Sequence, residues 1–255
     1  AITDSAGCQT NETTSVTVHD NPVPHITISP DPEFCSGDTI TLSGTFSGGS
    51  GNLSQQFWSA ENGNFISDTD NDTAHFSASI HGITRITYQI TDENSCSGDS
   101  SVLLTVFPNP QAAIISNDST CAGSELQLLS SPTGGTPGYT HQWYGETGYL
   151  TGDDNIQNPV FLTSEPGNYE LFYQVQDVNN CSDKDTVSLT VLQLPQTNLT
   201  PPDTAVCEGN TIIIHGNPIS GDMPVTDNLW TGTDMAFLET QEQNAIFSEI
   251  GRAHV

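Results

Sequence analysis

The chain has very little positive charge. Only 3 of its 255 residues are Lys or Arg, against 31 Asp and Glu, so the formal net charge is −28 at pH 7. A surface this acidic repels the phosphates of nucleic acids and of anionic lipid headgroups. We therefore expect no nucleic acid among the partners of the chain.

Long apolar segments are also missing. No stretch approaches the roughly 18 consecutive apolar residues of a membrane-spanning helix, so we expect no membrane insertion. No window shows a sustained helical period of apolar residues either. Alternating stretches such as TRITYQI at 84–90 occur instead, and such alternation predicts β-strands.

The signatures of common hydrolases are absent. The 7 histidines form no H-E-x-x-H pattern, and the chain contains no G-x-S-x-G motif. Pairs of Asp and Glu occur throughout so acidic a chain, so they carry no information about acid–base catalysis. We predict that the chain is not an enzyme.

One pattern recurs at a nearly constant spacing. Three cysteines are separated by 86 residues at both steps and each opens a C-x-G motif, and the 3 tryptophans of the chain follow at steps of 85 and 87. A period of this length is too long for a solenoid and suits a small β-domain. We predict an all-β chain of tandem β-sandwich domains in a linear array. The recurring residues are Cys35, Cys121 and Cys207, with Trp58, Trp143 and Trp230.

Proline-containing segments follow the last expected strand of each copy. They are NPVP at 21–24, FPNP at 107–110 and QLPQ at 193–196. Because proline cannot donate to a β-ladder and stiffens a connector, we expect short, stiff linkers there. The resulting division has the tail of a preceding repeat at 1–20, full repeats at 21–108 and 109–195, a truncated repeat at 196–249, and a non-native tail at 250–255.

Each tryptophan falls on the third expected strand of its copy. A tryptophan at that place in a β-sandwich fills the space between the two sheets, so we expect Trp58, Trp143 and Trp230 in the cores. The expected strands of the first full repeat are 26–28, 39–42, 56–58, 74–76, 84–90 and 102–106. Those of the second are 126–129, 141–144, 159–162, 169–175 and 187–191.

The six cysteines recur at fixed places, which favours disulfides and an oxidising compartment. Pairing within a repeat, Cys35 with Cys96 and Cys121 with Cys181, would close loops of 61 and 60 residues. A loop of that size contributes about 4 kcal/mol in the chain-entropy treatment. In an immunoglobulin topology, however, such positions lie at opposite ends of the sandwich, beyond the roughly 7 Å that a disulfide spans. Pairing within a repeat is our first expectation. Another strand plan, pairing across a domain junction and free thiols are the alternatives.

An acidic loop of the first full repeat is a candidate metal site, and Asp153-Asp154-Asn155 lies at a comparable place in the next repeat. Asp68, Asp70 and Asp72 form a D-x-D-x-D motif, whose spaced carboxylates suit a calcium ion. An EF-hand would need Gly and Glu where Thr73 and Ser79 stand. We therefore expect a solvated acidic turn and no cofactor, with a calcium site as the alternative.

The repeat as a whole resembles a known group. The C-x-G-x-x-x-x-L-x-G start, the Gly-rich turn, the Trp, the Asn-x-x-Phe and the closing Tyr-x-[IV]-x-Asp-x-x-x-Cys are similar to Ig-like and PKD-like repeats of large secreted Bacteroidota proteins. These proteins include gliding-motility-associated adhesins and cargo of the type IX secretion system. The resemblance covers residues 1–249. The PKD signature W-x-F-G-D-G is absent after all three tryptophans, which favours the Ig-like assignment.

The resemblance implies a non-catalytic, extracellular segment that is secreted or attached to the cell surface. Its repeats would act as a stalk or as surface-binding units. Its partners would be neighbouring repeats of the same chain and surface glycans or proteins. The alternative is an accessory β-sandwich region of a secreted multidomain hydrolase.

Overall fold

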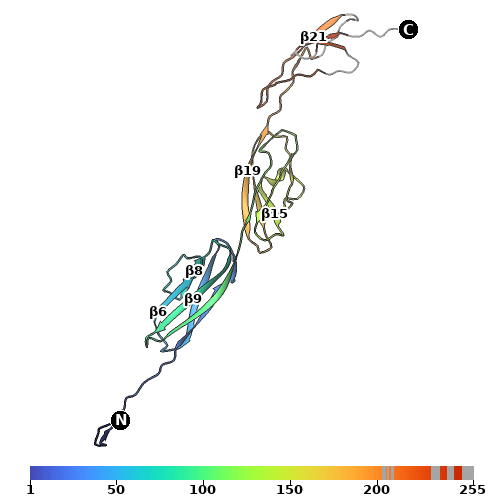
Figure 1. Ribbon diagram of the computed structural model, residues 1–255. Helices are drawn as coiled ribbons and strands as arrows, with labels where there is room; N and C mark the ends of the chain where they lie inside the picture. The colour runs from blue at the N-terminus through green and yellow to red at the C-terminus, as the bar shows by residue number, and fades with distance from the viewer. Residues whose placement is uncertain (203–204, 206, 208–209, 231–235, 240–243, 249–255) are drawn as a thin grey trace. The chain divides into compact units, whose positions relative to one another are not determined.

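The fold is known from a computed structural model, which describes residues 1–202, 205, 207, 210–230, 236–239 and 244–248. The tail expected at 250–255 lies outside these residues. Within the described residues the chain consists of strands, turns and one short 3₁₀ turn at Thr147–Tyr149 (Figure 1). None of the described residues belongs to a helix with the length and apolar character to cross a membrane. The predicted all-β class is confirmed.

The first full repeat folds into two four-stranded sheets, with the strand orders β3-β5-β8-β7 and β4-β10-β9-β6. The first order corresponds to strands A, B, E and D of an immunoglobulin sandwich, and β6, β9 and β10 correspond to C, F and G. Strand β4 is added beside β10 in parallel orientation. The bounds are β3 (Pro22–Ser29), β4 (Glu33–Cys35), β5 (Thr39–Gly48), β6 (Leu53–Ala60), β7 (Asn64–Phe65), β8 (Thr73–Ser77), β9 (Gly82–Asp92) and β10 (Ser97–Phe107).

The core of this repeat follows from the alternation of its strands. Along β9, Ile86, Tyr88 and Ile90 are buried, whereas the residues between them point away from the core. They pack with Trp58 from β6 and Phe76 from β8, both fully buried. The period of two therefore brings apolar side chains from both sheets into one layer.

The start of the repeat differs from the expectation. The segment at 21–24 was expected to be a linker, yet Pro22 and Pro24 belong to β3 and lie opposite Gly48 and Phe46 of β5. Strand β3 is at the edge of its sheet, where a missing N–H donor is tolerated. The short strands β4 and β7 were not predicted, because two or three residues carry no alternation that a sequence pattern could detect.

The second full repeat has one regular sheet, with the order β12-β19-β18-β15, and two smaller ones, β13-β17-β16 and β11-β14. In its less regular half, the expected strands at 126–129 and 159–162 shrink to two residues each. The bounds are β11 (Pro110–Gln111), β12 (Ser119–Cys121), β13 (Leu126–Gln127), β14 (Thr133–Gly134), β15 (Thr140–Gly145), β16 (Leu150–Thr151), β17 (Val160–Phe161), β18 (Gly167–Gln176) and β19 (Ser182–Leu192).

Strands also form near both ends of the chain. A hairpin of β1 (Ile2–Thr3) and β2 (Gln9–Thr10) corresponds to the end of a repeat. The third repeat contributes one sheet with the order β20-β21-β23-β22. Its strands are β20 (Leu199–Thr200), β21 (Thr211–Gly216), β22 (Ala236–Glu239) and β23 (Asn244–Ser248).

The chain divides into two compact units whose limits do not coincide with the sequence repeats. The first unit holds residues 1–110 together with 134–139 and 176–182, two loops that belong to the second repeat in sequence. The second unit holds the remaining residues. The first unit therefore contains the whole first repeat and the two loops of its successor.

Candidate functional site

A disulfide inside the first unit joins Cys35 to Cys181, whose Cα atoms are 5.5 Å apart. The two cysteines are separated by 146 residues and belong to successive copies of the repeat. The expected pairs within a repeat, Cys35 with Cys96 and Cys121 with Cys181, are therefore wrong. The alternative of pairing across a repeat junction is the one that the structure contains.

Strand geometry explains why pairing within a repeat fails. Cys35 lies opposite Phe107, the last residue of β10, whereas Cys96 immediately precedes the first residue of that strand. A strand of that length spans roughly 30 Å at about 3.3 Å per residue. Because a disulfide needs Cα atoms within about 7 Å, Cys35 and Cys96 cannot meet in the folded repeat.

The first half of the disulfide is a strand end. Cys35 is the last residue of β4, and the next residue, Ser36, donates its N–H to the carbonyl of Phe107 at 2.8 Å. The N–H of Asp38 then returns to the carbonyl of Cys35 at 3.0 Å, closing a turn through Gly37. Gly37 has φ = 90°, which a residue with a Cβ adopts only with strain. The C-x-G motif therefore fixes the direction in which the backbone continues after Cys35.

The second half is a turn held by a buried carboxylate. Asp177 is 4% exposed and accepts the N–H groups of Asn179 at 2.9 Å and Cys181 at 3.0 Å through Oδ1. Its Oδ2 accepts the N–H of Thr136 at 2.8 Å. One side chain thus ties the cysteine turn to the loop at 134–139, so the Asp of the D-x-x-x-C motif has a structural role.

The same turn occurs in the first repeat around Asp92, which is 1% exposed. Burial alone would raise the pKa of this carboxyl, but the N–H groups of Cys96, Ser50 and Asn94 and the Ser50 hydroxyl bond to it and lower the pKa below its usual value. Asp92 therefore stays ionised in the folded chain, which suits an acceptor of several N–H groups.

Four cysteines remain as free thiols. Cys8, Cys121 and Cys207 are exposed and Cys96 is partly exposed. Cys121 corresponds by sequence to Cys35, and Cys96 to Cys181. The alternative of free thiols is therefore also realised, in the same chain as the disulfide.

The tryptophans of the two full repeats lie at the centres of their sandwiches. Trp58 and Trp143 are both 0% exposed. The indole N–H of Trp58 donates to the carbonyl of Asn71 at 2.9 Å, and that of Trp143 donates to the carbonyls of Ile156 at 3.2 Å and Gln157 at 3.3 Å. Each ring therefore fills a core while its polar group is satisfied by a neighbouring loop.

Each buried tryptophan packs on a tyrosine from the neighbouring strand. The rings of Trp58 and Tyr88 are stacked with centroids 4.3 Å apart, and those of Trp143 and Tyr173 are 5.0 Å apart. The Tyr88 hydroxyl donates to Oε1 of Gln56, whereas the Tyr173 hydroxyl lies against Nδ1 of His141.

The acidic loop at Asp68, Asp70 and Asp72 bonds to the core through backbone carbonyls. All three side chains are exposed. The carbonyls of Thr69 and Asn71 accept the backbone and indole N–H groups of Trp58 at 2.8 and 2.9 Å. In the part of the chain that the structure describes, no three His, Cys, Asp or Glu side chains gather in a group that could hold a metal ion.

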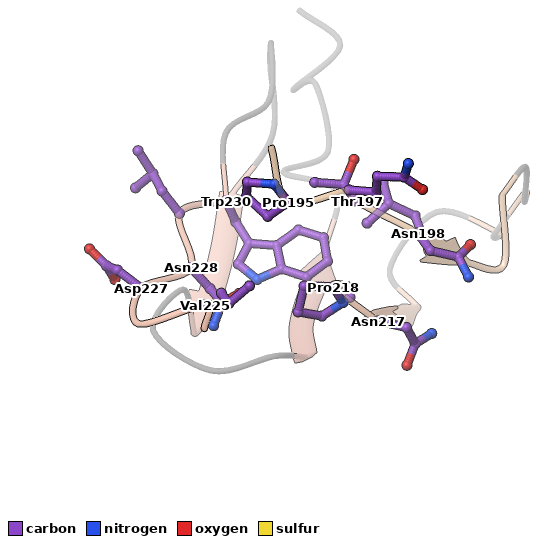
Figure 2. A pocket seen from close by; sticks show the side chains of 13 residues that line it. Pro195, Thr197, Asn198, Asn217, Pro218, Val225, Asp227, Asn228 and Trp230 are labelled. Atoms are coloured by element: carbon purple, nitrogen blue, oxygen red, sulfur yellow. The ribbon is translucent and has the colours of Figure 1, made fainter. Parts of the chain in front are cut away.

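Trp230 of the third repeat differs from its two counterparts, because it is only partly buried. It lines a pocket of about 200 Å³ together with Pro195, Pro218 and Val225. Figure 2 shows the indole between the two proline rings, with Val225 beside it.

Comparison with known proteins shows the fold. No protein-family model matches the chain, and no curated protein matches its sequence. The N-terminal eight Ig domains of Down Syndrome Cell Adhesion Molecule isoform 1.30.30 superpose with a TM-score of 0.50 at 13% identity, over 91% of this chain and 33% of that structure. The chain thus spans about a third of the length of that structure.

Two further structures show weaker similarity. The insect immune protein hemolin has a TM-score of 0.37 at 16% identity, covering 71% of this chain and 49% of hemolin. The fibronectin(III)-like modules of Clostridium thermocellum CbhA have a TM-score of 0.33 at 20% identity, covering 66% of this chain and 95% of the modules. The structural neighbours are thus Ig-like and fibronectin-III-like domains, and at these identities the similarity concerns the fold alone.

Proposed function

We propose that the chain is a non-catalytic segment of a large secreted, cell-surface protein, in which the repeats act as a stalk or as surface-binding units. The observation that carries the proposal is the disulfide between Cys35 and Cys181, which connects successive Ig-like repeats. A disulfide of this kind persists in oxidising, extracellular surroundings. It supports a localisation outside the cytoplasm.

The contacts made at the end of β4, in the first unit, support a spacer role. Besides the disulfide, the side chain of Asn109 donates to the carbonyl of Ser36 at 2.9 Å, immediately beside Cys35. This hydrogen bond holds the linker at 107–110 against the end of β4, and the disulfide is the covalent link from β4 to the next copy. Restricted junctions suit a protein that holds a functional end away from a surface.

A binding role is supported by the outer face of the β6-β9-β10 sheet. This face carries hydroxyl pairs, Thr87 with Ser101 at 3.0 Å and Thr91 with Ser97 at 3.1 Å, and the half-exposed ring of Phe57. Polar groups around one aromatic ring are suited to contact glycans or proteins. The partners that we propose are surface glycans or proteins and the neighbouring repeats.

The repeat motif supports a finer assignment. Its similarity to repeats of Bacteroidota adhesins leads us to propose that the parent protein is of the gliding-motility-associated, type IX secreted kind. The alternative is an accessory region of a secreted hydrolase. It predicts binding to an insoluble polysaccharide such as cellulose or chitin, whereas the stalk function predicts none.

The test measures distances in the full chain. Two spin labels are attached through non-canonical amino acids at the exposed positions Thr45 and Thr151, one in each full repeat. A stalk predicts one narrow distance distribution in the oxidised chain and a broader one in Cys35→Ser. A distribution that is equally broad in both would contradict the spacer role. Pull-down on polysaccharide particles then separates the hydrolase alternative.

A further inference from the structure

Each full repeat carries one cysteine of each kind, at opposite ends. The strand cysteine is the last residue of β4 or β12, and the turn cysteine immediately precedes β10 or β19. The observed disulfide joins the strand cysteine of one copy, Cys35, to the turn cysteine of the next, Cys181. The turn cysteine of the first copy and the strand cysteine of the second are left unpaired.

The unpaired strand cysteine is held as Cys35 is held. Cys121 ends β12, which pairs in parallel with β19 and places Cys121 opposite Leu192. The N–H of Ala122 donates to the carbonyl of Leu192 at 2.9 Å, and the N–H of Ser124 returns to Cys121 at 3.0 Å. These are the bonds that Ser36 and Asp38 make around Cys35.

Cys207 repeats the last of these bonds. The N–H of Asn210 donates to its carbonyl at 3.0 Å, and its thiol is exposed. Cys121 therefore has the same backbone geometry as Cys35 but no disulfide partner, and Cys207 has part of that geometry.

The unpaired turn cysteines are held as Cys181 is held. The N–H of Cys96 donates to Oδ1 of Asp92 at 2.9 Å, and the N–H of Cys8 donates to Oδ1 of Asp4 at 2.9 Å. In both turns the Asp N–H returns to the cysteine carbonyl, at 2.9 Å for Asp92 and 3.0 Å for Asp4. The residue before Cys96, Ser95, has φ = 63°, as Asn180 before Cys181 has φ = 65°.

We propose that these four thiols are open halves of the same inter-repeat disulfide. The partner of Cys121 and of Cys207 is the turn cysteine of the copy that follows each of them. The partner of Cys96 and of Cys8 is the strand cysteine of the copy that precedes each of them. Each bond would form by thiol–disulfide exchange, in which a small disulfide accepts the two electrons and two protons that the two cysteine thiols lose and leaves as two thiols. Every repeat would thus be bonded to both neighbours, and the occupant of each half-site is a further copy of this repeat.

The pairing rule also accounts for the bonds that do not form. It joins unlike cysteines of adjacent copies in one direction only, so it forbids Cys96 with Cys121, although only 25 residues separate them. It forbids pairing within a copy for the reason of strand length given above. The single bond that the rule allows between two cysteines of this chain is Cys35–Cys181, which is the one observed. The rule rests on geometry, so it holds whether or not the chain is adhesive.

The first test completes the third repeat. Residues 249–255 are replaced in the full chain by a second copy of residues 163–195, which supplies a turn with its own cysteine 86 residues beyond Cys181. The chain is refolded under air with a thiol–disulfide buffer, alkylated, and mapped by mass spectrometry without reduction. We expect Cys121 to leave the alkylated pool and to appear linked to the added cysteine.

Matched controls make this result specific. The same elongated chain with the added cysteine replaced by Ser should leave Cys121 fully alkylated. The Cys35–Cys181 peptide should be present in both and reports that the original repeats have folded. A Cys121 that pairs with Cys96 or Cys207 would overturn the proposal.

The second test does not depend on the third repeat. A copy of residues 109–173 placed before Ala1 of the full chain completes the preceding repeat and supplies a strand cysteine for Cys96. We expect the linked pair to form, and Asp92→Ala in the same chain to reduce its yield several-fold, because the turn that presents Cys96 is lost. Should Cys96 stay alkylated while Cys35–Cys181 is intact, the proposal fails, whatever the first test gives.

Discussion

The two full repeats have the same core and differ in how one of their sheets is held together. In the first repeat, β3 and β5 are paired along eight residues, from Pro22 opposite Gly48 to Ser29 opposite Thr41. In the second, the corresponding half is reduced to short sheets and the single bridge between Ile114 and Ser130. The two full repeats thus resemble each other more closely in their buried side chains than in the backbone hydrogen bonds of this sheet.

Side chains replace the missing ladder of the second repeat. The carboxylate of Asp183 accepts the N–H of Ala112 at 2.8 Å, and that of Asp185 accepts the N–H of Ile114 at 2.7 Å. Pro132 stands where the first repeat has Phe46 and cannot donate to a ladder. Backbone donors that lose a carbonyl partner therefore find carboxylates, which satisfies them equally well.

A second difference lies beside the buried tryptophans. The hydroxyl of Tyr88 donates to Oε1 of Gln56 at 2.7 Å, whereas the hydroxyl of Tyr173 lies 2.7 Å from Nδ1 of His141. Burial raises the pKa of both tyrosines and lowers that of His141. The second repeat therefore has a titratable group where the first has a neutral amide.

The largest effect is expected from the residues that the two repeats share. Trp58→Ala and Trp143→Ala should each lower the free energy of unfolding by about 3 to 5 kcal/mol, the usual range for truncating a large buried aromatic side chain. Amide hydrogen exchange of the full chain would show which repeat opens more often. A loss below about 1 kcal/mol for either change would mean that the ring contributes little to its core. Trp230→Ala, at a half-buried position, is the milder reference.

The next effect separates paired from unpaired strand cysteines. Cys35→Ser should lower the free energy of unfolding by about 2 to 4 kcal/mol, because the disulfide limits the conformations of the unfolded chain. Cys121→Ser, at an exposed free thiol, should stay within about 0.5 kcal/mol. Urea unfolding without reductant measures both. Equal effects of the two substitutions would show that the disulfide does not stabilise the fold.

A smaller effect is expected from the aspartates that accept backbone N–H groups in the second repeat. Asp185→Ala leaves the N–H of Ile114 without its acceptor and should cost about 1.5 to 3 kcal/mol, the range for hydrogen bonds to charged groups. Asp185→Asn keeps an acceptor oxygen and should cost less. Ser100→Ala, at the matched position of the first repeat, should be nearly neutral in thermal unfolding. A neutral Asp185→Ala would show that this bond is dispensable.

The smallest effect is a pH dependence confined to the second repeat. His141 has a lowered pKa in the folded chain, so the unfolded chain binds the proton more readily. Stability of the second repeat should therefore fall as the pH drops from the ordinary histidine value of about 6.5 towards the lowered folded value. His141→Gln, which installs the residue of the first repeat, should remove this slope in thermal melts between pH 7 and 5. An unchanged slope would assign it to other groups.

Much of the fold follows from patterns in the sequence. The alternation at 84–90 and 169–175 predicts the central strands, and the recurring tryptophan locates the third expected strand of the two full repeats. These signals survive because buried positions tolerate few residue types. The irregular sheet of the second repeat could not be predicted. LQLL at 126–129 has the composition of a strand, but the N–H groups of Ala112 and Ile114 bond to the carboxylates of Asp183 and Asp185 instead of to a neighbouring strand.

The spacing of the cysteines along the sequence could not predict which of them pair. A separation of 61 residues and one of 146 are both chemically acceptable, and the choice depends on which ends of successive copies approach each other. The strand-length objection to Cys35 with Cys96 could be raised from sequence, and it was correct. The D-x-x-x-C spacing was visible too, but it gives no sign that its Asp orients the cysteine of a turn.

The disulfide has a consequence for a chain that is pulled from its two ends. Because Cys35 and Cys181 are covalently joined, tension passes from one sulfur to the other and bypasses the backbone between them. Even if both repeats unfolded, those residues would add no length. At 3.3 to 3.6 Å per extended residue, a separation of 146 residues corresponds to about 500 Å of slack that force cannot release. The segment between Cys35 and Cys181 would then act as a tether of nearly constant length, and it would lengthen only where a reductant reaches the bond.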